Sequence, residues 1–424
     1  MASTSTTAVE RESVESFRSR ARAWLAANMP RSNGRIADRT APGRMDAERA
    51  LQRRLWDGGF AGICFPAEFG GLGLPVEYQH AFSDEALDYD MPFAINVPTL
   101  GILAATLVDF GTAEQKSRHL PAILRGDELW VQFLSEPSGG SDLAGCLTRA
   151  ERDGDVFILN GSKIWSSSAY LSDYALCLAR TNWDVPKHRG LTMFIVKIHQ
   201  PGIQVEQIRQ VDGSMEFCQE FFDDVAIPVS AVVGEIDDGW TVATRLLVHE
   251  RNAVGGGSPY TSGRTIGHES SSADDPLVAL MKATGRASDE RVRELIARAH
   301  VDLLVRGQLI DRVSRGIASG TMSPSCSSII KLFGADVVIG RAEIGLELAG
   351  VDGVVWPLDG TETNQARALG RSSLSRQGVA LGGGSNEIQR NIISERVLGM
   401  PREYAADREV PYRDVRRGPS SPAR

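Results

Sequence analysis

A strand, a small-residue loop and a hairpin follow one another between residues 130 and 169, and this order constrains the fold more than any other stretch. Apolar residues alternate through residues 130–134, as in a strand, and the glycines of Ser138-Gly139-Gly140 then allow a sharp turn. Residues 156–169 read as a hairpin turned at Asn160-Gly161. A Gly/Ser loop alone is usually only a turn, but it also lets backbone N–H groups approach a flat ring or a phosphate.

Helical periodicity lies on both sides of this β-rich middle, so the chain is expected to be an α+β multidomain protein. The expected units are an N-terminal helical domain, a middle β-domain, a C-terminal helical bundle and a flexible tail, over residues 1–128, 129–238, 239–405 and 406–424. Residues 253–276 are rich in Gly, Ser and Asp and are expected to interrupt the C-terminal helices.

Composition excludes several classes of function. The 424 residues are 42% hydrophobic and 24% charged, as in ordinary soluble globular proteins. A net charge of -8 argues against nucleic acid as the main partner. We expect no membrane span and no leader peptide, and therefore a cytoplasmic protein. The 5 cysteines are scattered and form no metal-type pair, so reduced thiols and no metal site are expected.

Two motifs in the middle domain resemble the signatures of the acyl-CoA dehydrogenase family. Residues 135–142, Ser-Glu-Pro-Ser-Gly-Gly-Ser-Asp, are similar to the family's Thr/Ser-Glu-Pro-x-x-Gly-Ser-Asp loop, and residues 161–167 to its Gly-x-Lys-x-Trp-x-Ser/Thr strand. The resemblance extends over roughly residues 10–405. It implies an N-terminal helical domain, a middle antiparallel β-barrel domain, a C-terminal four-helix bundle and FAD as cofactor.

The resemblance assigns FAD contacts within these motifs. Ser135 and Ser167 would hydrogen-bond the isoalloxazine edge, and Trp165 would lie against the ring. A redox flavin needs hydrogen-bond donors where charge grows and an apolar surface that excludes water. The further contacts implied are Gln132 and Leu134 by backbone or packing, and Ser141 near phosphate or pantetheine. The plain alternatives are a core aromatic for Trp165 and a solvated hydroxyl for Ser141.

Other FAD contacts are implied in the C-terminal domain, at Glu347, Gly350, Ser385 and Glu387. The family also clamps the FAD pyrophosphate of the neighbouring subunit with an Arg-x-x-Phe-Gly segment. The corresponding region here lacks the phenylalanine, and Arg264 is the candidate for the arginine of this segment. A partner subunit is therefore one way to complete the site.

The resemblance also locates the general base. Family members commonly carry a glutamate just before a Gln-Ile-Gln-Arg-like helix start, but Gly383 stands there in this chain. Isovaleryl- and long-chain-type members instead use a Glu-Arg pair on the first helix after the β-domain, which matches Glu250 and Arg251. Glu250 is thus the expected base, with Arg251 and Gly383 at the substrate. A solvated Glu-Arg face is the plain alternative, and Glu387 is a remote third candidate for the base.

The implied reaction is α,β-dehydrogenation of an acyl-CoA to the trans-2-enoyl-CoA. Glu250 would take the α proton, the β hydrogen would leave as hydride to FAD, and an electron-transferring flavoprotein would receive the electrons. A homo- or heterotetramer is expected. Two alternatives stay open, namely a non-catalytic partner subunit of a heteromeric enzyme and a flavin monooxygenase or oxidase. The glycines at 382–384 suit a branched or polycyclic acyl group.

Overall fold

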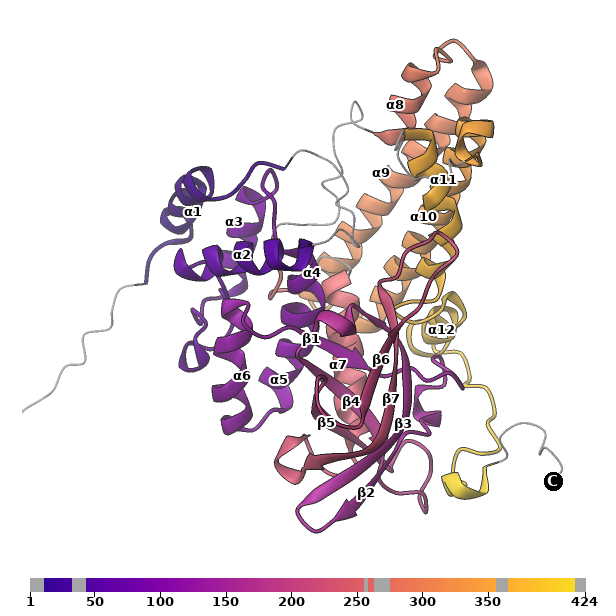
Figure 1. The fold of residues 1–424 in the computed structure, drawn as a ribbon. Helices are drawn as coiled ribbons and strands as arrows, with labels where there is room; N and C mark the ends of the chain where they lie inside the picture. Colours follow the sequence, from indigo (N-terminus) through magenta and orange to yellow (C-terminus); the bar gives the residue numbers. More distant parts are fainter. Residues whose placement is uncertain (1–10, 33–42, 255–257, 263–274, 356–364, 416–424) are drawn as a thin grey trace, which may run out of the picture.

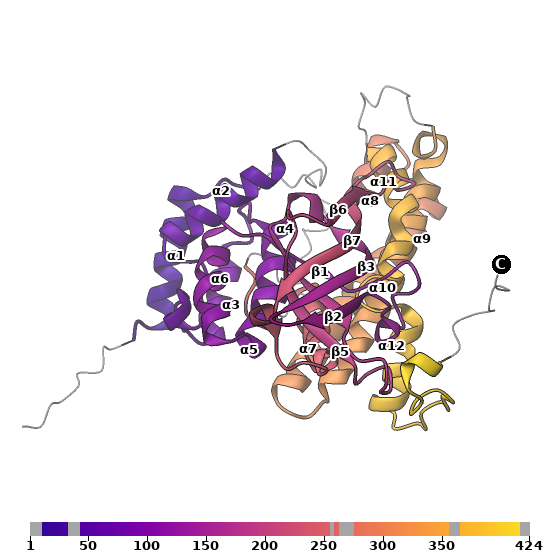
Figure 2. The same ribbon diagram turned by 60° about the horizontal axis from the view of Figure 1, so that its bottom comes forward.

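The computed structural model describes residues 11–32, 43–254, 258–262, 275–355 and 365–415. A β-sheet lies between helices from the two ends of the chain (Figure 1). Seen from a second direction, the sheet again separates the N-terminal helices from the C-terminal ones (Figure 2). The three expected parts of the fold are therefore present, in the expected order.

The N-terminal helices pack around an aromatic core. They are α1 (Val14–Asn28), α2 (Arg44–Asp57), α3 (Val76–Glu85), α4 (Phe93–Ile95), a π-helical segment (Asn96–Ala104), α5 (Ala105–Phe110) and α6 (Ala113–Arg125). Phe17, Phe60 and Phe82 are fully or almost fully buried, and the Phe60 ring contacts the other two rings in this core. The apolar stretch Phe93–Phe110 is long enough to cross a bilayer, but 61% of it is buried, which is typical of a core helix.

The middle domain is an eight-stranded sheet with strand order β6-β7-β3-β2-β4-β5-β8, while β1 pairs with β4 beside this path. The strands are β1 (Trp130–Phe133), β2 (Arg149–Asp153), β3 (Val156–Ser167), β4 (Tyr174–Arg180), β5 (Leu191–Lys197), β6 (Ile203–Gln207), β7 (Phe217–Pro228) and β8 (Val232–Val233).

Most neighbouring strands are antiparallel, as expected, but β4 runs parallel to β1 and, at one residue pair, to β2. The first motif loop, β2 and β3 lie between β1 and β4 in the sequence. This long connection allows β1 and β4 to run in the same direction. No pairing joins β6 to β8 among the described residues, so the expected barrel is an open, mixed sheet.

The C-terminal helices lie beside the sheet (Figure 1), and all of them except the first pack together as a bundle. They are α7 (Gly239–Val254), α8 (Pro276–Ala283), α9 (Glu290–Ala318), α10 (Ser327–Ala349), α11 (Gln365–Ser375) and α12 (Asn386–Ile392). The first packs instead on β5, α5 and the π-helical segment. Sequence periodicity does not reveal α11, which contains three serines and a glycine in 11 residues. Packing on α10 supports it, and Gly370 is needed because a Cβ there would lie 1.8 Å from the Gly353 carbonyl oxygen.

Part of the expected tail is packed on the middle domain. Tyr412 is buried, and the Arg180 guanidinium lies 3.8 Å from its ring centroid. The Tyr412 backbone N–H donates to the Val185 carbonyl at 2.9 Å. Residues 406–415 therefore differ from the expected flexible tail, and residues 416–424 lie outside the described residues.

Candidate active site

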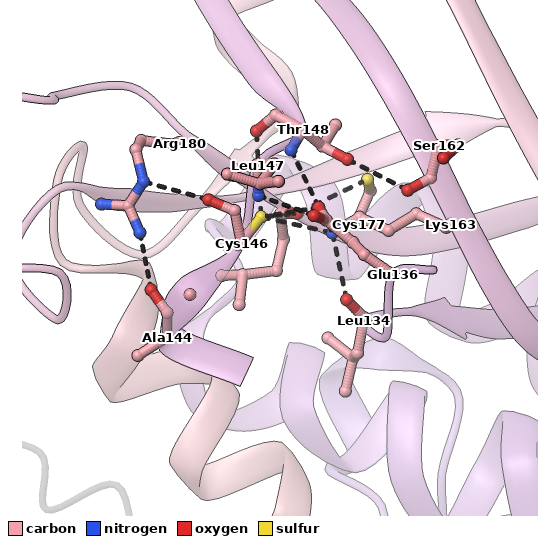
Figure 3. Close-up of polar contacts among 12 residues, drawn as sticks. Leu134, Glu136, Ala144, Cys146, Leu147, Thr148, Ser162, Lys163, Cys177 and Arg180 are labelled. Carbon is pink, nitrogen blue, oxygen red and sulfur yellow. Dashed lines mark hydrogen bonds and ion pairs between the residues drawn. The ribbon is translucent and has the colours of Figure 1, made fainter. Parts of the chain in front are cut away.

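A buried ion pair joins the two motifs of the middle domain (Figure 3). The Lys163 ammonium, on β3, donates to Glu136 Oε1 at 2.8 Å and to the Leu134 carbonyl at 3.0 Å. Glu136 also accepts the backbone N–H groups of Leu147 at 2.6 Å and Thr148 at 2.8 Å. Burial alone would raise the pKa of Glu136, but Lys163 and these donors hold that pKa at about 2.

This ion pair fixes the backbone of the loop that carries Ser135. The Ile164 N–H of β3 donates to the Ser135 carbonyl at 2.9 Å. Glu136 and Gly139 exchange backbone hydrogen bonds of 3.2 and 2.9 Å, which closes the tight turn. Ser135 is half-buried and Leu134 is buried, whereas Ser141 is exposed at the outer side of the loop.

Trp165 projects from a β-bulge in β3. The register between β3 and β7 shifts between Ile164 and Ser166, and Trp165 has φ +69°, which a bulky residue rarely adopts. The residue is 54% exposed, and its ring contacts Phe217 edge-on, with the ring centroids 5.9 Å apart. The bulge thus presents Trp165 and Ser167 outward and turns Ser166 inward.

Glu250 lies on α7 beside the start of the sheet. The Gln132 side-chain amide, on β1, donates to Glu250 Oε2 at 3.2 Å. Burial raises the pKa of Glu250, while the Gln132 hydrogen bond and the charges of Arg251 and Lys331 lower it, and the net direction is upward. A carboxyl with a raised pKa, held at the junction of two domains, suits a general base.

Gly383 faces Glu250 from the other side. A Cβ at this position would lie 3.6 Å from Glu250 Oε1 and 3.4 Å from Lys331 Cε. The two positions at which the sequence led us to look for the base are therefore adjacent in this fold, and of the two only residue 250 is a carboxylate. Gln389 holds the glycine turn because its amide donates to the carbonyls of Gly383 at 3.1 Å and Gly384 at 3.3 Å.

Sequence reasoning missed Lys331. It is half-buried on α10, with its ammonium bonded to the Val379 carbonyl, and its pKa is lowered by burial and raised by Glu250. No motif marks it, since α10 is far from α7 in the sequence. Arg251 is also half-buried, and burial lowers its pKa, against the opposing effect of Glu250.

Not all of the other residues expected to contact FAD in the C-terminal domain lie near Glu250. Ser385 is buried and caps α12, because its hydroxyl accepts the Ile388 N–H at 3.3 Å. Glu387 is exposed beside Arg390, at 3.7 Å. Glu347 pairs with Arg291 at 3.4 Å, and at 1.5 Å per residue it lies roughly 24 Å along α10 from Lys331. Gly350 follows α10 at the same end, and Arg264 lies outside the described residues.

The residues between the motif loop and α7 fit a flavin. Trp165 offers a flat apolar surface, and the exposed Ser167 and half-buried Ser135 lie on the bulge and the loop that Lys163 ties together. Gln132 Oε1 is buried and has no hydrogen-bond partner among the described residues, so it is free to accept from a ligand group. These features are what an isoalloxazine ring requires of its site.

Comparison with known proteins identifies the family. Models of the N-terminal, middle and C-terminal domains of acyl-CoA dehydrogenases match residues 11–127, 132–225 and 237–398. The acyl-CoA dehydrogenase IpdE1 of Mycobacterium tuberculosis is 37% identical over 402 residues, covering 92% of this chain and 99% of that protein. The chain belongs to the acyl-CoA dehydrogenase family, whose members are oxidoreductases acting on CH–CH bonds.

Two solved structures agree with this assignment. The Tcur3481-Tcur3483 steroid ACAD has a TM-score of 0.71 and 29% identity, covering 93% of this chain and 99% of that chain. The ChsE4-ChsE5 complex from Mycobacterium tuberculosis has a TM-score of 0.68 and 27% identity, covering 94% of this chain and 100% of that chain.

Proposed function

We propose that this chain is a FAD-dependent dehydrogenase that converts an acyl-CoA to its trans-2-enoyl-CoA, with Glu250 as the general base. The observation that carries the proposal is the position of Glu250. Its carboxyl is bonded to Gln132 of β1, next to the flavin-type motifs, and it faces Gly383 across the site. The charged alternative at position 383 is absent, so the base must come from α7.

Each neighbour of Glu250 has a role in the proposed reaction. Gln132 fixes the carboxyl through one oxygen and leaves the other free to take the α proton. Arg251 and Lys331 provide positive charge that keeps part of the carboxyl ionised despite burial. Bound FAD would supply the oxidising power, as acceptor of the β hydrogen. Trp165 and the surrounding apolar residues would exclude water from the reacting carbons.

The proposed substrate is an acyl-CoA with a branched or ring-bearing acyl group. Gly383 removes side-chain volume next to the base, and the similar Tcur3481-Tcur3483 protein is described as a steroid ACAD. We further propose that the chain works in the cytoplasm and passes electrons to an electron-transferring flavoprotein.

The proposed assembly is a homo- or heterotetramer. Glu347 and Gly350 are remote from Glu250 in the same chain, so any contact they make with FAD is with FAD bound to another subunit. The similarity to the ChsE4-ChsE5 complex favours a heteromeric arrangement.

Spectroscopy of the purified protein tests the proposal and separates the alternatives. We expect stoichiometric FAD, whose absorbance near the visible maximum is bleached by ring-bearing or branched acyl-CoAs without oxygen. A colourless protein that still assembles with a FAD-containing partner would favour the non-catalytic subunit. Rapid reoxidation of the reduced flavin by air, with hydrogen peroxide or hydroxylated product, would favour the oxidase or monooxygenase.

A further inference from the structure

A second carboxyl lies beneath the Trp165 bulge and has no role in the proposed reaction. Glu220, on β7, is 0% exposed and lies opposite Lys163 in the β3–β7 register. Its Oε1 accepts the hydroxyl of Ser166, the inward-facing residue of the bulge. Its Oε2 is buried without a hydrogen-bond partner among the described residues. This carboxyl is therefore much less satisfied than Glu136 on the other side of Lys163.

The bulge depends on this contact. Trp165 and Ser168 both have positive φ, at 69° and 59°, and such conformations cost free energy that neighbouring contacts must offset. Ser166 is the residue between the outward Trp165 and Ser167, and Glu220 is its side-chain partner. The hydrogen bond to Glu220 thus fixes the segment that presents Trp165 and Ser167.

The charge of Glu220 is poorly compensated. The titratable groups that face it are Lys163 on β3, Cys177 on β4 and Cys218 on its own strand. Lys163 is engaged by Glu136, and both thiols have a pKa raised by burial, so they stay neutral near pH 7. Burial raises the pKa of Glu220 to about 7, although Ser166 and Lys163 act to lower it.

We propose that Glu220 is a positioning residue whose proton controls the order of the 165–168 bulge. When Glu220 is protonated, the neutral carboxyl is tolerated in the apolar interior and the bulge is closed. When Glu220 ionises, an unpaired buried charge favours states in which water reaches it between β3 and β7, and the bulge loosens. This property concerns the scaffold and extends beyond the proposed reaction.

Amide hydrogen exchange of a peptide that covers the bulge tests the proposal. Wild-type full-length protein is labelled over a series from about pH 6 to about pH 8, with times corrected for intrinsic exchange. We expect protection to fall several-fold with a midpoint near pH 7, the pKa of Glu220. In Glu220→Gln, which keeps an oxygen for Ser166 but cannot titrate, protection should stay high throughout. The exposed carboxylate Glu206 on β6 gives the control, Glu206→Gln, which should behave as wild type.

Two results would overturn the proposal. One is a wild-type protection that stays flat or falls with a midpoint far from pH 7, which decides the matter even if Glu220→Gln does not fold. The other is the same loss of protection in Glu220→Gln as in the wild type.

A binding measurement links the bulge to the cofactor. Since Trp165 and Ser167 are proposed FAD contacts, the FAD affinity of the wild type should weaken several-fold over the same pH range, and that of Glu220→Gln should not. This part rests on the proposed cofactor. A chain that binds no FAD at any pH would contradict the cofactor assignment, while the exchange experiment would still decide the role of Glu220.

Discussion

Glu136 follows β1 in the chain, Glu250 contacts Gln132 of β1, and these two carboxylates have opposite surroundings. Glu136 accepts hydrogen bonds from Lys163, two backbone N–H groups and the Cys146 thiol, and its pKa is lowered to about 2. Glu250 accepts one hydrogen bond among the described residues, from Gln132, and burial raises its pKa. The number of donors separates them: a fully satisfied carboxylate holds two segments together, whereas a poorly satisfied one is ready to take a proton.

The role of Glu136 in holding two segments together predicts a large loss of stability in Lys163→Met. Removing one partner of a buried pair leaves an uncompensated charge and should cost about 3–5 kcal/mol of unfolding free energy. Denaturant unfolding measures the change. Lys187→Met, which removes the ion pairs with the more exposed Asp142 and Asp407, should cost no more than about 1 kcal/mol. Equal losses in the two variants would contradict the structural role given to Glu136.

The role of Glu250 as the base predicts that Lys331→Met shifts the pH dependence of flavin reduction. The Lys331 charge lowers the pKa of Glu250, so its removal raises that pKa further. Because the base must be ionised to act, the rising limb of the flavin-reduction rate should move to higher pH, with a reduced rate at neutral pH and recovery above it. Stopped-flow reduction over a pH series measures this. Lys282→Met, an exposed lysine on α8, should leave the limb in place, and an unmoved limb in Lys331→Met would rule out the coupling.

A smaller effect is expected from Gly383→Ala, which probes the space opposite Glu250. The added methyl would contact Glu250 Oε1 and Lys331 Cε, and at φ +70° it should cost about 1–2 kcal/mol of stability. KM for ring-bearing acyl-CoAs should rise more than KM for short straight chains. Gly382→Ala is the control, because among the described residues a Cβ there would meet just the Gly378 carbonyl oxygen, at 3.5 Å. Equal changes for both substrate classes would remove the proposed role of Gly383 in substrate choice.

The sequence was sufficient for the order of the three parts, because motifs and periodicity are local signals, while the assignment of the base to Glu250 stays a prediction. It was insufficient for features that depend on tertiary contacts. The parallel β1–β4 pairing, the packing of Tyr412 on Arg180 and the helix α11 all require partners distant in the chain. Lys331 and Glu220 are also features of this kind. Their surroundings arise from burial and from contacts with residues distant in the sequence, so no sequence motif marks them.

The rate of flavin reduction in Glu250→Gln tests the central claim most directly. Glutamine preserves size and the contact with Gln132 but cannot take a proton, so reduction by a substrate acyl-CoA should slow by about 10²- to 10⁴-fold, with FAD content unchanged. Glu387→Gln, which alters the other candidate for the base, an exposed carboxylate on α12, should reduce its flavin at close to the wild-type rate once the protein is loaded with FAD. Wild-type reduction in Glu250→Gln, or a comparable loss in Glu387→Gln alone, would contradict the assignment of the base to α7.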